Sequence, residues 1–467
     1  MNSQQKVSSE RPYEADEALP TKITHGCSSS QGGPRPTQGT PAGCDDSHLP
    51  SQKLPPHSRY TVSEGTLLWS CPQPLPLESG DLLHRVQVGY RTWGTLAPDG
   101  CNTVLVCHAL TGTVDVDAWW GGVLGAGRAF DPRTDFIVCS NVLGGCYGST
   151  GPTSYCTHNT WDTYGPEFPA ITIRDMVSLS ALHLAALGVQ RLALVAGGSM
   201  GGMIAQEWAA MQPLPVDALV VVAAPAQHSP WAVGLGHTQR AAIRADAGWL
   251  GGRYPAHSPP QQGLALARMV AMCSYRSPES FALRFQRRKR GDGAFQVESY
   301  LRYQGSKLAG RFDPGSYIAI SLAMDSHDLS RGRKGAGTDK DEDRGANAGM
   351  LVTVQQPALV LGITSDVLYP PAEVAALAEW LPAATLGWID SPHGHDAFLI
   401  EQGQVNEAIL SFRRGLGLQR LEGGSGSGYG YKSAAAVALL YLLCRTKAML
   451  VIMHTLIVDV SSMRRNE

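Results

Sequence analysis

Short, continuous apolar runs recur along the middle of the chain, and several are flanked by glycine, proline or asparagine. Runs of this length without alternation are typical of parallel strands that are buried on both faces. Such runs occur at residues 103–107, 136–139, 192–196, 218–224 and 358–363. Residues 86–93 instead alternate between apolar and polar side chains, which predicts an antiparallel strand at the edge of a sheet.

A helix is predicted between the second and the third of these runs. Its apolar residues recur at helical spacing: Met176, Leu179, Leu182 and Leu187. Thr172 and Asp175 have the spacing of a helix start, and Gly188 supplies the stop. Strands that alternate with such helices indicate an α/β fold with a mostly parallel, doubly wound sheet.

The alternation lapses between residues 227 and 350, where the pattern becomes mostly helical. We expect this segment to form a lid over the carboxyl ends of the strands, where ligands bind in open α/β sheets. The core then comprises residues 61–226 and 351–416. Polar composition predicts a disordered tail over residues 1–60 and a disordered loop over residues 330–349 within the lid.

The last segment, residues 417–467, contains a glycine-rich linker followed by two apolar runs. Each run is too short to span a bilayer alone. Three interpretations stay open for this extension: a helix that docks on the core, a helix on a membrane surface, and an artefact of gene prediction.

Composition narrows the class of protein without identifying its chemistry. The formal net charge of −2 gives no electrostatic basis for binding nucleic acid or an anionic membrane. A basic run at residues 287–290 is predicted to be a solvated face.

The ten cysteines form no C-x-x-C pair, and Cys107 and Cys139 lie in strand-like runs. This pattern favours buried, reduced thiols in a cytoplasmic enzyme over a disulfide framework or a metal site. Residues 1–50 contain no apolar segment of the signal-peptide type.

The most specific local motif is Gly197-Gly198-Ser199-Met200-Gly201, which lies between a buried run and a helix-forming segment. This is the G-x-S-x-G nucleophile elbow of α/β-hydrolase folds. Small residues on both sides let the chain turn sharply enough to hold the Ser199 hydroxyl at the top of the sheet. The N–H of the following residue, Met200, then points toward a developing oxyanion.

A nucleophilic serine needs a base, and the base needs an anion that fixes its tautomer. In this fold the order along the chain is Ser, then Asp or Glu, then His. Asp366 follows the run at 358–363, and His395 follows a strand-like segment at 385–389. From the residues alone other candidates stay open: His393 for the base, and Asp390 and Asp396 for the acid.

The second oxyanion donor is expected in the loop that follows the strand at 103–107. This loop comprises residues 108–112, and Leu110 is the natural donor beside Met200. His108 precedes the small residues of the loop, which suggests that it shapes the loop and is not a catalytic base.

These motifs together resemble those of homoserine O-acetyltransferases. The resemblance extends from about residue 66 to residue 416, and five segments carry it: residues 108–112, 140–152, 197–203, 297–305 and 394–399. It implies that acetyl-CoA donates an acetyl group to Ser199 and that the hydroxyl of homoserine then accepts it, as in methionine biosynthesis. It also implies that His395 is the base and that Asp366 orients it. A homodimer that needs no cofactor is the further expectation.

The acceptor of such a reaction carries a carboxylate and an ammonium group. Arg240 matches a lid arginine of the family and is expected to bind the carboxylate, and Asp396 is expected to bind the ammonium. The chain departs from the family pattern at residues 236–238 and at Val367, close to the expected acceptor pocket. These departures put the identity of the acceptor in question more than the chemistry.

Three other functions compete with this one. The first is the same chemistry with serine as the acceptor or succinyl-CoA as the donor. The second is a serine esterase, because the same triad hydrolyses its acyl-enzyme when water enters. The third, a relative without enzymatic activity, is disfavoured because Ser199, Asp366 and His395 are all present.

Overall fold

The computed structural model describes residues 60, 62–156, 163–333 and 354–417. The chain divides into two compact units, Met1–Ile409 and Leu410–Glu467, and the sheet and lid helices described below belong to the first. The predicted N-terminal tail, except Tyr60, lies outside the described residues. So do residues 334–349 of the predicted lid loop and the C-terminal extension after residue 417.

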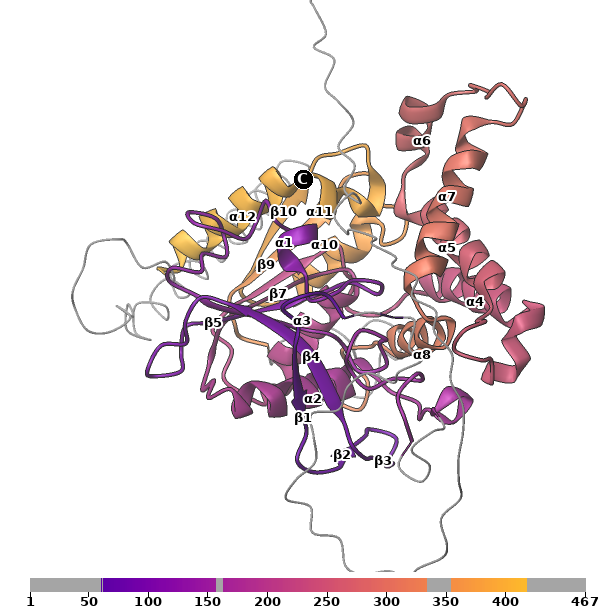
Figure 1. Ribbon diagram of the computed structural model, residues 1–467. Coiled ribbons are helices and arrows are strands. Elements are labelled where there is room, and N and C mark those ends of the chain that lie inside the picture. Colours follow the sequence, from indigo (N-terminus) through magenta and orange to yellow (C-terminus); the bar gives the residue numbers. More distant parts are fainter. Residues whose placement is uncertain (1–59, 61, 157–162, 334–353, 418–467) are drawn as a thin grey trace, which may run out of the picture. The chain divides into compact units, whose positions relative to one another are not determined.

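An eight-stranded sheet forms the centre of the first unit, with the strand order β1-β4-β6-β5-β7-β8-β9-β10 (Figure 1). Its strands are β1 (Leu67–Ser70), β4 (Gln87–Trp93), β5 (Thr103–Cys107), β6 (Phe136–Ser140), β7 (Leu192–Gly198), β8 (Leu219–Val222), β9 (Ala358–Ile363) and β10 (Ala384–Ile389). From β6 to β10 every neighbouring pair is parallel. All five apolar runs form strands here, which confirms the prediction of a mostly parallel sheet. The short strands β2 (Leu75–Pro76) and β3 (Leu82–Leu83) pair separately.

The alternating segment forms β4, which is antiparallel to β6 as expected for its pattern. It is not the edge strand, however, because β1 pairs with its other side. The prediction of an edge was wrong, since alternation reports how exposed the two faces of a strand are. The alternation of side chains does not show whether the backbone groups of the strand pair with another strand.

Helices of the core alternate with these strands. They are α1 (Val116–Trp119), η1 (Gly165–Glu167), α2 (Ile173–Ala186), α3 (Met200–Met211), α10 (Pro371–Trp380), η3 (Gly394–Asp396), α11 (Ala397–Ile400) and α12 (Gln402–Gly415). Helix α2 begins as predicted with a capping box between Thr172 and Asp175, and Gly188 follows its end with a φ of 87°. Helices α2 and α3 pack together, and α3 also packs on β7 and β8.

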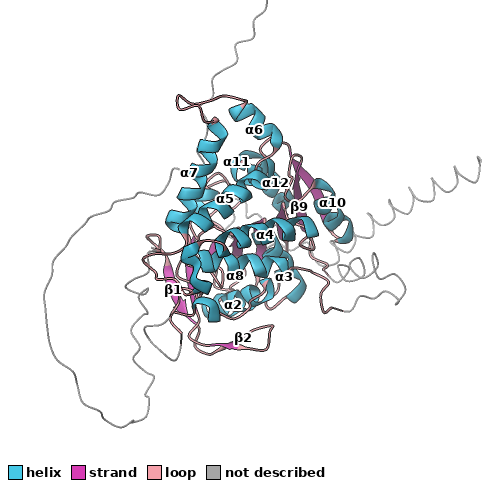
Figure 2. Ribbon diagram, turned by 90° about the vertical axis from the view of Figure 1, so that its right-hand side faces the viewer, coloured by secondary structure: helices cyan, strands magenta, loops and turns pink. Residues whose placement is uncertain are grey.

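Between β8 and β9 lies a helical insertion, in the interval where the lid was expected. Its helices are α4 (Pro230–Arg244), η2 (Ala247–Gly252), α5 (Gln261–Tyr275), α6 (Pro278–Phe285), α7 (Gln296–Arg311) and α8 (Pro314–Asp325). Side chains of Ser229, Ser277 and Asp313 cap α4, α6 and α8. In both ribbon views the end formed by α6 and α7 projects beyond the neighbouring helices (Figures 1 and 2).

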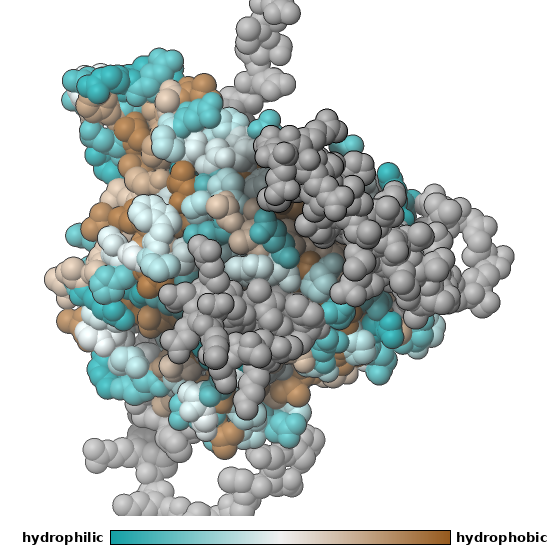
Figure 3. Space-filling view, turned by 180° about the vertical axis from the view of Figure 1, so that it is seen from behind, coloured by the Kyte–Doolittle hydropathy of each residue, from teal (hydrophilic) through white to brown (hydrophobic). Residues whose placement is uncertain are grey.

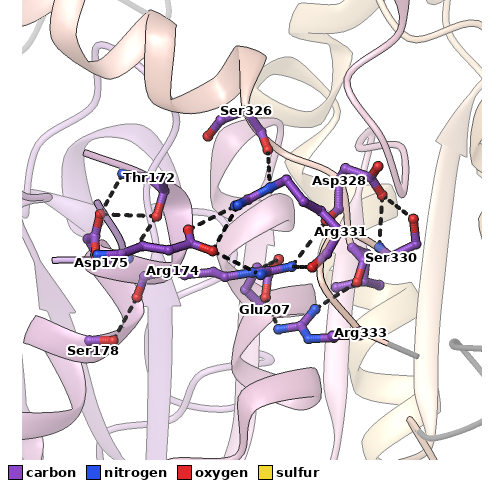
Figure 4. A network of polar contacts seen from close by, with 12 residues as sticks. Thr172, Arg174, Asp175, Ser178, Glu207, Ser326, Asp328, Ser330, Arg331 and Arg333 are labelled. Atoms are coloured by element: carbon purple, nitrogen blue, oxygen red, sulfur yellow. Dashed lines mark hydrogen bonds and ion pairs between the residues drawn. The ribbon is translucent and has the colours of Figure 1, made fainter. Parts of the chain in front are cut away.

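A network of ion pairs joins the last described residues of the insertion to the core (Figure 4). The carboxylate of Glu207 on α3 is buried between the guanidinium groups of Arg174 on α2 and Arg333. Glu78 pairs with Arg174 at 3.0 Å and with Arg331 at 2.8 Å. Burial raises the pKa of Glu78, but the hydrogen bond from Arg331, a further one from a threonine and the two guanidinium charges lower it to about 2. The network therefore fastens the insertion to α2 and α3.

The structure tests several predictions that were made from composition. Cys107 and Cys139 are free, buried thiols, as predicted. The basic run at residues 287–290 is exposed, as predicted. Among the described helices, none has both the length and the apolarity that crossing a membrane requires.

Candidate active site

Ser199 lies at the sharp turn between β7 and α3, with a φ of 57° and a ψ of −126°. This left-handed backbone is rare for a residue with a side chain. The turn also brings the first residues of α3 against the end of β5, because a Cβ atom at Gly201 would collide with the carbonyl oxygen of Cys107. The small residues of the motif are thus required by close backbone approach.

Asp366 and His395 form the hydrogen-bonded pair that the sequence placed on neighbouring loops. Nδ1–H of His395 donates to Oδ2 of Asp366 at 2.7 Å, and both side chains are almost completely buried. The other oxygen of Asp366 accepts the backbone N–H groups of Leu368 at 2.8 Å and Tyr369 at 3.0 Å. The carboxylate is therefore fixed by two loop amides while it orients the imidazole.

The environment of His395 suits a base. Three aromatic rings surround the imidazole, with centroids at 5.8 Å for Tyr275, 5.2 Å for Tyr369 and 5.6 Å for Phe398. Burial lowers the pKa of His395, but the charge and hydrogen bond of Asp366 and the charge of Asp396 outweigh it, so the pKa is raised. Its Nε2 has no hydrogen-bond partner among the described residues and is free to take a proton.

The residues that competed for these positions lie elsewhere. Nδ1 of His393 faces the hydroxyl of Ser280 at 3.4 Å, away from Asp366. Burial, together with the charge of Arg276, lowers the pKa of His393. Asp390 accepts the hydroxyl of Thr364 at 3.1 Å in an exposed loop. Of the candidates, only Asp366 and His395 are brought together.

The loop at residues 108–112 follows β5 as expected, and Leu110 in it is buried. Nδ1–H of His108 donates to the carbonyl of Ala109 at 2.8 Å, while its Nε2 accepts the N–H of Val142 at 3.3 Å. Burial lowers the pKa of His108 to about 4 despite the hydrogen bond to Ala109, so the ring is neutral near pH 7. His108 holds the loop in place, as the sequence suggested.

Arg240 on α4 is only 3% exposed, so it is not a surface arginine. Its guanidinium pairs with Asp325 at the end of α8 and donates to the hydroxyl of Ser321 at 3.3 Å. The other oxygen of Asp325 faces Nδ1 of His228 at 3.3 Å, and Nε2 of His228 faces the hydroxyl of Tyr369 at 3.2 Å. A chain of polar contacts thus runs from Arg240 to the ring that packs against His395.

Asp396 follows the base directly, but it already has a cationic partner within the chain. Its Oδ2 lies 3.2 Å from Nε of Arg276, and each side chain is 16% exposed. Helix α5 contacts η3, which contains both Asp396 and His395, and Tyr275 at the end of α5 packs on the imidazole. Helix α5 of the insertion therefore contacts the element that carries His395.

Comparisons with known proteins extend these observations. A family model described as the alpha/beta hydrolase fold matches residues 102–402, which include the serine, the aspartate and the histidine. The homoserine O-acetyltransferase of Trichormus variabilis is 48% identical over 359 residues, or 77% of this chain and 96% of that protein. This chain belongs to the homoserine O-acetyltransferase family. The resemblance inferred from five short segments is confirmed.

Solved structures show how far the fold is shared by this family and by hydrolases. The homoserine O-acetyltransferase from Bacillus anthracis superimposes with a TM-score of 0.66 at 24% identity, covering 74% of this chain and 96% of that one. An acetylester hydrolase from Corynebacterium glutamicum gives a TM-score of 0.65 at 25% identity, with coverage of 75% and 96%. The predicted α/β-hydrolase fold is confirmed, and the fold alone does not separate acetyl transfer from hydrolysis.

Sequence reasoning missed the partners that surround the family motifs. Asp325, His228 and Tyr369 join Arg240 to the catalytic pair, yet they are far apart in the chain and match no short motif. Arg276, the partner of Asp396, was missed for the same reason. Tyr369 was the one of these residues that the sequence could have indicated, because it lies three residues after Asp366 in the same loop.

Proposed function

We propose that this protein is a homoserine O-acetyltransferase that moves the acetyl group of acetyl-CoA to the hydroxyl of L-homoserine through an acetyl-Ser199 intermediate. One observation carries the proposal: the buried 2.7 Å hydrogen bond between Asp366 and His395 leaves Nε2 of the imidazole free. A base prepared in this way activates a hydroxyl nucleophile. Membership of the homoserine O-acetyltransferase family is our reason for proposing acetyl-CoA as the donor and homoserine as the acceptor.

In the first half-reaction Nε2 of His395 takes the proton of Ser199 while Oγ attacks the thioester carbonyl of acetyl-CoA. The N–H groups of Leu110 and Met200 stabilise the oxyanion of the tetrahedral intermediate. When the intermediate collapses, the carbon–sulfur bond breaks and the imidazolium returns the proton to the thiolate of CoA. Acetyl-Ser199 and free CoA thiol are the products of this step.

In the second half-reaction His395 takes the proton of the homoserine hydroxyl, which attacks the acetyl-serine ester. When this tetrahedral intermediate collapses, the bond between the acetyl carbon and Oγ of Ser199 breaks, and the imidazolium returns the proton to Oγ. O-acetylhomoserine is released and the free serine is restored. We assign the acceptor's carboxylate to the guanidinium of Arg240 and its ammonium to the second oxygen of Asp396. Burial of Arg240 supports this assignment, because a desolvated guanidinium binds a carboxylate more strongly than an exposed one does. Asp325 and Arg276 then hold the two recognition groups in place.

The competing functions differ in what receives the acyl group. Helix α5 and its Tyr275 lie over the base, which supports transfer because a covered acyl-enzyme is protected from water. The resemblance and the composition also lead us to propose a cytoplasmic homodimer that needs no cofactor. Light scattering after size exclusion tests the dimer.

The decisive experiment offers the purified protein acetyl-CoA or succinyl-CoA with homoserine, with serine, or with no acceptor, and follows free thiol release. We expect rapid release only with acetyl-CoA and homoserine, and a mass increase of one acetyl group on Ser199 when the acceptor is left out. Ser199→Ala should abolish both while the fold is retained. Thiol release at the same rate without an acceptor would show a hydrolase, and release with serine or succinyl-CoA would show one of the related transferases.

A further inference from the structure

The lid carries a strong local excess of positive charge. Residues 261–311, which contain α5, α6 and α7, include ten Lys or Arg against three Asp or Glu. Their net charge is +7 in a chain whose total is −2. The remainder of the chain is therefore acidic, and the positive potential is concentrated on one group of helices.

Much of this charge lies at the projecting end of α6 and α7, in what we call the basic tip: Arg284, Arg287, Arg288 and Lys289. All four are exposed, and none forms an ion pair with a carboxylate of the described residues. The guanidinium of Arg287 and the ammonium of Lys289 lie over the ring of Phe295 at 5.3 Å and 5.1 Å. Figure 3 shows the hydrophilic surface of this end at its upper left.

The contacts within the tip hold the cations in place without neutralising them. The guanidinium of Arg288 donates to the carbonyl oxygens of Arg284 and Phe285 at the end of α6, and Arg284 lies 4.8 Å over the ring of Tyr300. Carbonyl groups and aromatic faces carry no formal charge. In contrast, the neighbouring Arg290 has Asp292 at 3.8 Å. The four members of the tip retain their charge for an anion outside the chain.

Helix α6 connects the tip to the catalytic pair. Its cap, Ser277, donates to the carbonyl of Pro392, and a Cβ atom at Gly394 would come within 2.5 Å of the Ser277 nitrogen. The start of α6 thus touches the loop that carries His395. The helix has eight residues, so it places the tip roughly 12 Å further from that loop at 1.5 Å per residue.

We propose that the basic tip binds the phosphate groups of the acyl donor, which for acetyl-CoA are its diphosphate and ribose phosphate. The proposal rests on the function proposed above. A pantetheine arm is a chain comparable with about four extended residues, or ~14 Å. This length matches the rise of α6, so the phosphates of a donor whose thioester lies beside His395 can reach the far end of the helix. Clustered guanidinium and ammonium groups are the usual partners of phosphate in proteins.

The test compares two acetyl donors in the full-length protein. Acetyl-CoA carries the phosphates, whereas S-acetyl-N-acetylcysteamine keeps the thioester and lacks them. In the triple variant Arg287→Gln, Arg288→Gln, Lys289→Gln we expect kcat/KM for acetyl-CoA to fall at least tenfold. For the truncated donor it should change less than twofold. The decline in wild-type kcat/KM with added salt should also become shallower in the variant, because fewer charges are screened.

A matched control removes the same charge elsewhere. Arg85, Arg128 and Arg244 are exposed and lie outside α5, α6 and α7. Changing all three to Gln should leave kcat/KM for both donors within twofold of the wild type. An equal loss in this control would overturn the proposal, since net charge alone would then explain the effect. Circular dichroism and thermal unfolding verify that both triple variants are folded.

Two results in the tip variant would also overturn the proposal: an unchanged kcat/KM for acetyl-CoA, or an equal loss with the truncated donor. Calorimetric titration with CoA itself separates this outcome from failure of the proposed function. If the wild type binds CoA and the tip variant binds it at least tenfold more weakly, the phosphate site stands even when no acetylhomoserine forms. Equal CoA affinity in the two proteins refutes the site whatever reaction is catalysed.

Discussion

Replacing Asp366 with Asn tests the catalytic pair with the smallest change of shape. The amide oxygen can still accept the N–H groups of Leu368 and Tyr369, so the loop keeps its anchors. The amide nitrogen then faces Nδ1 of His395 in place of the carboxylate oxygen that lies at 2.7 Å. Because that nitrogen donates, Nδ1 must accept, and the imidazole proton moves to Nε2. The atom that should take the proton of Ser199 is then already protonated.

The expected loss is large because both partners are buried. The corresponding change in a serine protease triad lowers kcat by roughly 10⁴-fold, which is about 5.5 kcal/mol of transition-state stabilisation. The pH dependence should change as well. The reaction needs a neutral imidazole, so the wild-type rate falls as pH drops through the raised pKa of His395. Without the carboxylate, burial is the main influence on the pKa of His395 and lowers it. The pH at which the rate starts to fall should therefore be lower than in the wild type, and the maximal rate should be smaller.

The assay is thiol release from acetyl-CoA with homoserine between pH 5 and 9, a range chosen to span the ordinary histidine pKa of about 6.5. Asp390→Asn is the matched control, since it makes the same chemical change on an exposed carboxylate at the start of the loop that carries His395. The side chain of Asp390 accepts the hydroxyl of Thr364, and its backbone bonds to the side chain of Gln404. This substitution should leave the profile unchanged. A rate for Asp366→Asn within tenfold of the wild type, or an acid limb that moves upward, would refute the reasoning.

Three further substitutions probe the elbow, the acceptor site and the ion-pair network. In Gly198→Ala the new Cβ would lie 2.7 Å from the ring of Phe398, so we expect about 1–3 kcal/mol of destabilisation and a lower kcat, because this ring packs on the base. Arg240→Lys should raise the acceptor KM by about tenfold to a hundredfold with little change in acetyl-enzyme formation, because it keeps the charge and loses the planar fork. Glu207→Gln should lower the free energy of unfolding in urea by about 3 kcal/mol, since two arginines lose their buried partner.

Matched controls distinguish these explanations from general damage. Gly310→Ala places a methyl group in open space on α7 and should stabilise the protein by about 1 kcal/mol; a loss of stability there would contradict the steric account. Glu298→Gln removes an exposed partner that lies 3.7 Å from Arg302 and should change stability by less than about 0.5 kcal/mol. A loss as large as that of the buried glutamate would contradict the role of burial. An acceptor KM unchanged in Arg240→Lys would remove that residue from the proposed site.

The core of the fold was predictable because its signals are local. A strand covered on both faces needs a continuous apolar run, and all five runs form strands. The edge of the sheet was not predictable. Strand β1 carries Leu67 and Leu68 with 50% and 37% exposure, so it lacks the alternation that would have identified it. Its position depends on pairing with β4, which lies some twenty residues later.

The candidate site divides in the same way. Ser199 stands in a motif whose glycines are required by backbone contacts, and Asp366 and His395 each follow a strand, so sequence order sufficed to propose them. The contact of Arg240 with Asp325 depends instead on how α4 packs against α8, which no short pattern encodes. The basic run was correctly predicted to be exposed, but only the structure shows that α6 connects it to the loop of the base.

The left-handed backbone of Ser199 lowers the stability of the protein at the residue on which its proposed activity depends. A side chain held at a φ of 57° costs of order 1–3 kcal/mol that glycine would avoid. Selection for a sturdier fold alone would therefore replace this serine, and Ser199→Gly should melt at a higher temperature than the active enzyme while transferring no acetyl group. The serine that we propose as the nucleophile therefore carries a thermodynamic penalty, so stabilising substitutions in this chain have to come from positions other than its elbow.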